Sequence, residues 1–483
     1  MNIALLIITG FLFLSIWLGI RSTKGKDMNL EQWTVGGRGF GAIFVFLLMA
    51  GEIYTTFSFL GGSGWAYGKG APALYVLIYI TLSYVLSYWL LPEIWAYAKK
   101  HNLMSQSDFF ASKYKSPILG ILAALVGVVS MIPVIVVQLK GLGIIVSEAS
   151  YGAISISTAV WMGAICLTIY VMLSGIHGSA WIAVIKDIMM LVIIGFLGIY
   201  LPIHYYGGFQ AMFEAINVAK PEFLKLPDQG LSISWFISTV ILLVFGFYMW
   251  PQVFSAVYSA RSGKVFRKNA IISPLYTLML LFVFFVGFAA ILKVPGLEGA
   301  DADLSLLRLS IQTFDPWFIG IIGGAGLLTA LVPGSMLLMS VATLLSKNVF
   351  KEFVPSISDQ TVVRLAKCLV PVIALISVYF TLNGGETMSA LILMGYSLIT
   401  QLFPSLLFSL RKNNFVHKYG AIAGIICGLA IVAYITLSNS TIGSLFPSLP
   451  QAAKDLNVGI IALSVNILVM IAVSLTVRRA QHK

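Results

Sequence analysis

The chain has 483 residues, of which 59% are hydrophobic and only 10% are charged, and its mean hydropathy is +0.95. A soluble domain cannot bury that much apolar surface, so the composition excludes a soluble globular protein and indicates a membrane protein. The formal net charge of +12 does not indicate nucleic-acid binding, because cytoplasmic loops that face anionic lipid explain it.

Apolar runs of about 20 residues recur along the whole chain and predict about 13 transmembrane helices in one domain. They cover residues 3–20, 41–64, 72–92, 117–146, 154–174, 181–202, 232–252, 271–292, 317–346, 365–383, 387–408, 419–437 and 458–477. With the N-terminus outside and the C-terminus inside, most of the 30 basic residues fall in cytoplasmic segments, as the positive-inside rule requires. We therefore expect an all-α, multi-pass protein of the cell membrane, N-out and C-in, whose first segment is an uncleaved helix.

Two of these spans are interrupted by glycine. In the second, FGAIFVFLLMAGEIYTTFSFLGGSG, a polar run follows Gly51, and the seventh has a milder break at Gly246 within LLVFGFYMWPQ. Glycine-interrupted helices five spans apart favour a transporter with inverted repeats and a binding site near the membrane midplane. For Gly61, Gly62 and Gly64, close packing or a turn explains the glycine as well as ligand contact does, whereas Gly51 stands beside a carboxylate and hydroxyls and favours a functional role.

Apart from Lys367 at the cytoplasmic end of its span, four charged side chains fall inside predicted spans, namely Glu52, Lys140, Lys186 and Asp187. A charge at the centre of a membrane helix costs roughly 2.5–3.5 kcal/mol, so each of these positions is a candidate functional site. A lysine near a pocket favours a carboxylate substrate, and Glu52 would oppose an anion unless Lys140 neutralises it. We therefore predict a Glu52–Lys140 pair across facing helices.

The polar and aromatic residues near the breaks form a candidate pocket. The predicted substrate-binding residues are Glu52, Thr55, Thr56, Ser58, Gln138, Lys140, Tyr248 and Trp250. The hydroxyls and Gln138 would form the floor of a small pocket, and the two aromatic residues would gate it. An aromatic residue at any one position is also explained by packing or by the interface belt of membrane proteins.

Several short motifs occur in order on the appropriate spans and resemble the sodium:solute symporter family, which includes proline/sodium and sugar/sodium cotransporters. They are WTVGGRGFG (33–41), GGSG (61–64), LSGIHGSAW (173–181), WPQVFSAVYSARSGKVFRKNAIISPLY (250–276) and SKNVFKE (346–352). AVIKD and VPGSMLLMSVATLLSKN most resemble a bacterial branch that includes monocarboxylate permeases.

The resemblance implies a fold with a five-plus-five inverted-repeat core that works by alternating access. Residues 1–40 would be a peripheral helix and loop, 41–202 the first repeat, 232–408 the second repeat, and 419–477 two accessory helices. It implies a small-molecule substrate, the lipid bilayer as partner, no cofactor, and a sodium ion or a proton as the coupling ion. It indicates no enzymatic activity and predicts no oligomeric state.

The sodium site of the family joins backbone carbonyls of the broken second span to hydroxyls of the ninth span. The carbonyl positions correspond here to Gly51 and Tyr54, but the paired hydroxyl residues correspond to Val332 and Pro333. Since sodium requires oxygen ligands, the site is lost or rebuilt. Candidates for rebuilding are Thr329, Ser335 and the carbonyl that Pro333 frees at position 329.

The sixth span also departs from the family pattern. Where some members carry Thr-Asp after a Trp-containing turn, this chain has Ile182 and Ala183, and Lys186 follows one turn later. We interpret Lys186 as a built-in cation at an altered sodium site, with Asp187 beside it, in a proton-coupled or uncoupled carrier. Pairing with Asp187 alone, snorkelling of the side chain to the cytoplasmic surface, and a structural bond to another helix remain open.

The sequence therefore predicts a secondary active symporter that imports a small organic solute, with a monocarboxylate as the expected substrate, coupled to sodium or protons. The alternatives are sodium symport of an amino acid such as proline and, from other classes, a transport-like sensor or a passive channel. The short end VRRAQHK argues against a sensor with a signalling domain, and paired broken helices favour alternating access over a channel.

Overall fold

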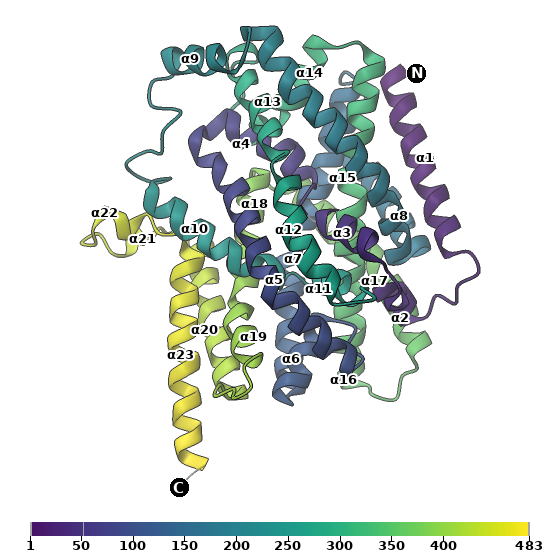
Figure 1. The fold of residues 1–483 in the computed structure, drawn as a ribbon, viewed down its shortest axis with the longest axis vertical. Coiled ribbons are helices and arrows are strands. Elements are labelled where there is room, and N and C mark those ends of the chain that lie inside the picture. The colour runs from purple at the N-terminus through teal and green to yellow at the C-terminus, as the bar shows by residue number, and fades with distance from the viewer. Residues whose placement is uncertain (1, 52, 482–483) are drawn as a thin grey trace.

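The computed structural model describes residues 2–51 and 53–481, and its regular structure is helical apart from an isolated parallel bridge between Phe40 and Ala260 (Figure 1). Within these residues, ten helical segments are long and apolar enough to cross a membrane, or eleven if the bent pair Ile233–Met249 and Pro251–Tyr258 forms one span. The predicted all-α membrane fold is confirmed. The count of about 13 spans and the N-out, C-in orientation stay predictions.

The first half of the chain supplies the first interrupted span and the longest helix. Its elements are α1 (Ile3–Thr23), α2 (Leu30–Val35), η1 (Gly36–Arg38), α3 (Ala42–Gly51), η2 (Phe57–Gly61), α4 (Gly62–Lys69), η3 (Ala71–Leu74), α5 (Tyr75–Lys100), α6 (Gln106–Tyr114), α7 (Pro117–Ala149), α8 (Ile156–Tyr206) and α9 (Phe209–Ala219). Helix α8 contains two predicted spans. At 51 residues it would be about 77 Å long if straight, but it breaks at Gly175, where φ is 53° and ψ is −152°. The break separates the two predicted spans.

The second half repeats the interruption. Its elements are α10 (Ile233–Gly246), η4 (Phe247–Met249), α11 (Pro251–Tyr258), α12 (Lys264–Thr277), α13 (Leu280–Lys293), η5 (Gly299–Leu304), α14 (Ser305–Thr313), α15 (Pro316–Thr343), η6 (Leu344–Phe350), α16 (Lys351–Phe353), α17 (Asp359–Asn383), α18 (Met388–Ile399), η7 (Thr400–Leu402), α19 (Phe403–Ser409), α20 (Lys418–Leu437), α21 (Ile442–Leu445), α22 (Gln451–Lys454) and α23 (Val458–Gln481). Helix α10 ends at Gly246, where the sequence predicted the break, but the axis bends by 51° four residues later, at Trp250 between η4 and α11.

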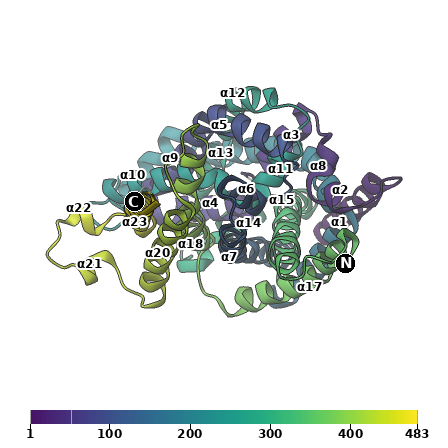
Figure 2. The ribbon, with the colours of Figure 1, turned by 90° about the horizontal axis from the view of Figure 1, so that it is seen from below.

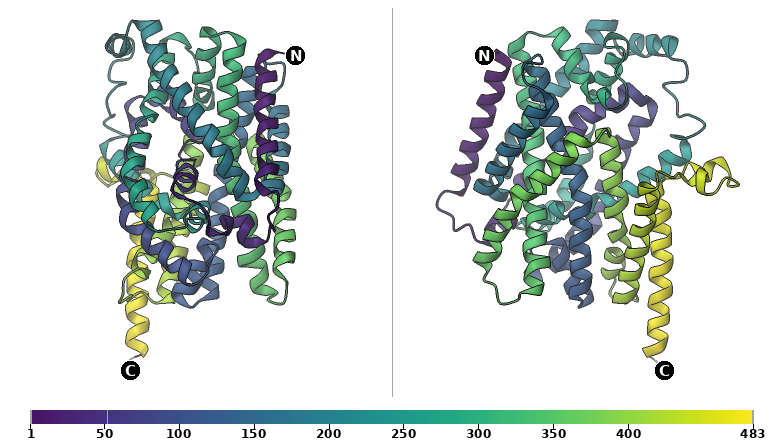
Figure 3. Two further views of the ribbon diagram at one scale, coloured as in Figure 1. Left: turned by 45° about the vertical axis from the view of Figure 1, so that its right-hand side comes forward. Right: turned by 180° about the vertical axis from the view of Figure 1, so that it is seen from behind.

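Helix α15 occupies the centre of the molecule, because its most apolar stretch is entirely buried by other helices. Viewed from below, α1 and α17 lie on one side of it, and α20 and α23 lie on the opposite side with α21 and α22 (Figure 2). Helix α23 extends beyond the other helices at one end (Figure 3). Most of α1 and α23 faces outward, as expected of helices in contact with lipid.

The break after α3 is stabilised by its own hydroxyl side chains. The Ser58 hydroxyl donates to the Ile53 carbonyl at 2.6 Å and accepts from the Thr55 amide at 2.9 Å, and the Thr55 hydroxyl accepts from the Phe57 amide at 3.2 Å. These bonds satisfy backbone groups that have no helical partner. The polar run that interrupts the span therefore also stabilises the interrupted backbone.

The glycines that follow this break allow close packing. A Cβ on Gly64 would lie 2.9 Å from backbone atoms of Ala302 and Asp303, and one on Gly61 would lie 2.9 Å from the Met388 side chain. Of the two explanations that the sequence left open for these two glycines, the structure shows packing. The same contacts hold η5 and the start of α18 against η2 and α4.

Candidate functional site

The side chain of Lys186 lies against the break of the second span. It is fully buried, and its Nζ lies 3.1 Å from the carbonyl oxygen of Tyr54 and 3.4 Å from that of Gly51. Because α3 ends at Gly51, these carbonyls point away from a regular helix and accept from an outside donor. The structure thus brings Lys186 to the two predicted carbonyl positions and does not show it snorkelling to the surface.

Asp187 forms an ion pair with Lys186. The Lys186 Nζ and an Asp187 carboxylate oxygen are 2.9 Å apart, although adjacent residues of a helix point about 100° apart. The long, flexible lysine side chain spans that difference and contacts both the carboxylate and the carbonyls. Asp187 is 4% exposed, so the pair is almost completely removed from water. The Lys186–Asp187 pair, which the sequence left open as an alternative, therefore exists together with the contacts of Lys186 to the two carbonyls.

Two tyrosines extend this polar centre. The Tyr54 hydroxyl donates to the backbone carbonyl of Tyr276 at 2.6 Å, and the Tyr276 hydroxyl donates to the backbone carbonyl of Asp187 at 3.3 Å. Their rings lie 4.6 Å apart between centroids. The break after α3 is therefore joined to α12 and α8 around Lys186.

Helix α15 presents an apolar side chain to this centre. A Cβ on Gly51 would lie 3.5 Å from Lys186 Nζ and 3.5 Å from a methyl of Val332, so Val332 borders the site at a position that corresponds to a family hydroxyl. The hydroxyls proposed as substitutes bond elsewhere. Thr329 donates to Gly326 of its own helix at 2.6 Å, and Ser335 lies 2.6 Å from the Ser179 hydroxyl.

A small central cavity of about 50 Å³ lies between the two helix breaks. Its lining residues are Ile53, Thr55, Phe57, Tyr79, Ile80, Val134, Phe247, Trp250, Gln252, Val253, Pro333, Leu337, Ile392 and Tyr396. They come from both interrupted spans and from α5, α7, α15 and α18. A cavity of this size holds a water molecule or a very small solute. It is the expected form of an occluded midplane site.

The structure places only some of the predicted substrate residues on this cavity. Thr55 and Trp250 line it, whereas Tyr248 is buried outside the described lining. The Thr56 hydroxyl bonds to the Gln138 amide oxygen at 2.9 Å, which ties η2 to α7. The Ser58 hydroxyl bonds to backbone groups of Ile53 and Thr55 in the break itself. These three predictions of a pocket floor therefore correspond, in this structure, to contacts that hold the broken helix in place.

Other lining residues were not predicted. Gln252 directly follows Pro251 in the WPQ segment quoted above. A polar residue just after the predicted break could therefore have been recognised from the sequence as a candidate for the pocket. Tyr79 and Tyr396 lie on α5 and α18, where nothing in the local pattern distinguishes them from the many aromatic residues of the chain. Pro333, proposed for the ion site, also lines this cavity.

Lys140 has a different partner from the one predicted. Its Nζ lies 2.8 Å from a carboxylate oxygen of Asp303 in η5 and 3.0 Å from the Glu386 carbonyl oxygen. Asp303 also accepts from the Met388 amide at 3.2 Å. Lys140 thus joins α7 to η5 and to the start of α18, away from the described lining of the cavity. Glu52, its predicted partner, lies outside the described residues.

The Asp303 carboxyl is 1% exposed. Burial raises its pKa above the ordinary value, although the Lys140 ammonium and the Met388 amide act in the opposite direction. The Lys140 contact is therefore what offsets much of the cost of burying this carboxylate.

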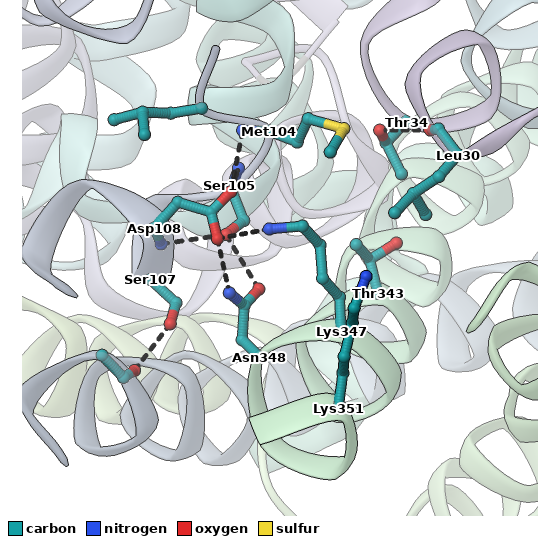
Figure 4. Close-up of polar contacts among 12 residues, drawn as sticks. Leu30, Thr34, Met104, Ser105, Ser107, Asp108, Thr343, Lys347, Asn348 and Lys351 are labelled. Atoms are coloured by element: carbon teal, nitrogen blue, oxygen red, sulfur yellow. Dashed lines mark hydrogen bonds and ion pairs between the residues drawn. The ribbon is translucent and has the colours of Figure 1, made fainter. Parts of the chain in front are cut away.

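A second polar cluster joins α6 to η6, the segment that follows α15 (Figure 4). Asp108 accepts from Lys347, from the Asn348 side chain at 2.6 Å and from the Met104 amide at 2.8 Å. Burial would raise the pKa of Asp108, but Lys347 and these hydrogen bonds outweigh it and hold the pKa below its ordinary value. Gln106 of α6 also donates to the carbonyl of Met249, so the cluster reaches the break of the seventh span.

The family model described as "SSF: Sodium:solute symporter family" matches residues 33–428, which include both interrupted spans and Lys186. The chain belongs to the sodium:solute symporter family. The resemblance predicted from the short motifs is confirmed. Membership and fold together make this a multi-pass membrane protein of a transporter family.

Two relatives and one solved structure illustrate the similarity. The chain is 70% identical to the "Uncharacterized symporter YhjB" of Bacillus subtilis, over 100% of this chain and 98% of the relative. It is 27% identical to a "Monocarboxylate transport permease protein" of Rhizobium johnstonii, over 92% and 90%. Its fold is similar to that of a Na+-coupled sialic acid symporter in a substrate-bound, outward-open state. The TM-score is 0.78, and the identity is 16% over 98% of this chain and 97% of the other.

Proposed function

We propose that this symporter takes up a small monocarboxylate by alternating access, and that a proton on Lys186 replaces the sodium ion of the family site as the coupling cation. The observation that carries the proposal is the Lys186 ammonium against the carbonyls of Gly51 and Tyr54 at the helix break.

The ion side of the proposal rests on the chemistry of these contacts. A lysine ammonium is a compact single positive charge that donates to carbonyl oxygens, so it serves the same acceptors as a sodium ion. The methyl of Val332 supplies no oxygen ligand, and the described bonds of Thr329 and Ser335 go to other groups. A proton leaving or entering the buried pair changes the charge beside the helix break.

Lys186 and the cavity can be coupled because adjacent residues of the break face one or the other. The Tyr54 carbonyl faces Lys186, whereas the residues on either side of it, Ile53 and Thr55, line the cavity. When the ammonium loses its charge, its attraction for the Tyr54 carbonyl weakens and the backbone at the cavity wall is free to rearrange. The same three residues therefore transmit the state of Lys186 to the substrate site.

The substrate side rests on the lining of the cavity. Thr55 and Gln252 offer polar groups among apolar and aromatic walls, which suits a small solute with one polar end. The cavity also contacts Trp250, Gln252 and Val253 at the start of α11, a helix that begins without a side-chain cap. The positive end of a half-helix favours a carboxylate. Similarity to the monocarboxylate permease supports the same class.

The test is uptake of labelled acetate, propionate, lactate, pyruvate and proline into proteoliposomes, with sodium and proton gradients imposed separately. Wild type is compared with Lys186→Ala and with Lys225→Ala, a surface lysine that is 68% exposed. We expect uptake of one or more monocarboxylates that follows the proton gradient, ignores sodium, fails in Lys186→Ala and persists in Lys225→Ala. Sodium-dependent uptake that survives Lys186→Ala would overturn the proposed coupling, and preferential uptake of proline would overturn the proposed substrate class.

A further inference from the structure

A second, larger cavity opens where α1 ends. It has a volume of about 540 Å³ and is lined by Leu18, Arg21, Ser22, Lys24, Lys26 and Trp181. The first five residues belong to the end of α1 and the connection to α2, which loops out from the body of the protein in Figure 1. Trp181 belongs to α8, so the cavity lies between two helices that pack against each other.

The lining is strongly positive. Arg21, Lys24 and Lys26 all face the cavity, and none of its described lining residues is acidic. The nearest carboxylates along the chain are Asp27, which is exposed, and Glu31, which is bound to Arg38 at 2.8 Å. Lys26 Nζ also lies 3.0 Å from His177 Nδ1, a contact that adds no negative charge. Three cations without a described counter-ion in the lining make this a site for a negatively charged ligand.

We expect the cavity to lie at the boundary of the membrane, because its cations directly follow the apolar helix α1. Helix α1 exposes Phe13, Trp17 and Ile20 along its outer face, and its first cation, Arg21, follows directly and lies over the Trp17 ring at 5.1 Å. Trp181 is 50% exposed and lines the same cavity. Exposed tryptophans beside a cluster of cations at a helix end are typical of the headgroup region. An anion that reaches the cavity from the membrane therefore carries an acyl chain.

We propose that this cavity binds an anionic phospholipid, whose phosphate contacts Arg21, Lys24 and Lys26 and whose acyl chain packs on Leu18 and Trp181. The charge of the lining complements the phosphate, and the apolar wall distinguishes the lipid from a free anion, which would use only the cations. Arginine and lysine are the residues that bind phosphate most readily.

The bound lipid would also contact the helices that form the Lys186 site. The Trp181 ring packs edge-on against Phe44 of α3, with centroids 5.2 Å apart. Helix α3 ends at Gly51, and α8 continues from Trp181 to Lys186. A lipid on Trp181 therefore stabilises the packing of α1 and α3 on α8. This inference does not depend on the identity of the substrate or of the coupling ion.

The test measures stabilisation of the full-length protein in neutral detergent as phosphatidylglycerol is added, with thermal unfolding as the readout. Phosphatidylcholine, glycerol phosphate and inorganic phosphate are added in parallel. The variant Arg21→Gln/Lys24→Gln/Lys26→Gln is compared with Arg411→Gln/Lys412→Gln/Lys418→Gln, which removes the same one arginine and two lysines elsewhere. Native mass spectrometry of retained phosphatidylglycerol provides a second readout that requires only a small amount of folded protein.

We expect phosphatidylglycerol to stabilise the wild type and the control, and the cavity variant to bind it roughly 100-fold more weakly, from about fivefold for each cation. Trp181→Ala, which keeps all three cations, should weaken binding of phosphatidylglycerol while leaving any effect of inorganic phosphate unchanged. Equal stabilisation of the cavity variant and the control would overturn the proposal. Stabilisation by glycerol phosphate equal to that by the lipid would also overturn it, because the ligand would then be a soluble anion.

Discussion

Replacement of Lys186 by methionine removes one partner of a buried ion pair and keeps most of the side-chain volume. The Lys186 side chain is 0% exposed, that of Asp187 is 5% exposed, and the charged atoms are 2.9 Å apart. At an effective dielectric constant of about 20, the attraction between unit charges at this distance is roughly 6 kcal/mol. Most of that attraction offsets the cost of desolvating the pair, so the loss of one partner is expected to cost about 3–5 kcal/mol.

A double-mutant cycle separates the pair from its surroundings. We expect Lys186→Met to destabilise the protein by about 3–5 kcal/mol, Asp187→Asn to cost less because the ammonium keeps two carbonyl acceptors, and the double variant to recover to within about 1 kcal/mol of the wild type. The assay is reversible unfolding in mixed micelles at increasing fractions of a denaturing detergent. Lys225→Met, at an exposed position, controls for the loss of a lysine.

Two results would refute this reasoning. A loss below about 1 kcal/mol for Lys186→Met would mean that the carboxylate finds water or another donor, so the pair is not isolated. Additive losses in the double variant would mean that each side chain acts through separate contacts. In the second case the Gly51 and Tyr54 carbonyls alone would hold Lys186 at the helix break.

Three further predictions concern the neighbouring polar groups. In a Lys186→Ala background, Val332→Ser should restore uptake that depends on sodium, because a hydroxyl beside the vacated carbonyls supplies an oxygen ligand. Uptake by the double variant is measured as the sodium concentration is raised. Uptake that does not depend on sodium would contradict the prediction. Lys140→Met should cost about 3 kcal/mol in unfolding assays at neutral pH, because Asp303 stays buried without its ammonium. The pKa of Asp303 is already raised, so the stability gained from protonating this carboxyl is full below the unfolded pKa of about 4 and is lost as pH rises through the folded pKa. Lys140→Met should therefore be less destabilised at pH 5 than at pH 8. An equal loss of stability at both pH values would contradict this. For Asp108 the sign is reversed, because its lowered pKa gives stability that is present above about pH 4 and is lost on acidification. Between pH 3 and 7, the free energy of unfolding should therefore fall more steeply with acidification for the wild type than for Asp108→Asn. Parallel curves would exclude a role for this cluster.

The sequence determined the features that depend on local composition and on fixed spacing. Long apolar runs require a bilayer, and a glycine followed by hydroxyls marked the interruption of the second span at Gly51. The resemblance to the family implied that the helix of Lys186 runs beside the carbonyls of Gly51 and Tyr54, and the structure shows these contacts. The role of Lys186 in coupling stays a prediction.

Only the tertiary structure decided which distant side chains meet. Lys140 pairs with Asp303, 163 residues away, and that partner lies in a short helix whose position no periodicity predicts. Thr56 and Ser58 look like ligands in the sequence, yet their hydroxyls bond to Gln138 and to the broken backbone. A hydroxyl serves a ligand or a backbone group equally well, so its role depends on which unsatisfied group lies closest once the helices have packed.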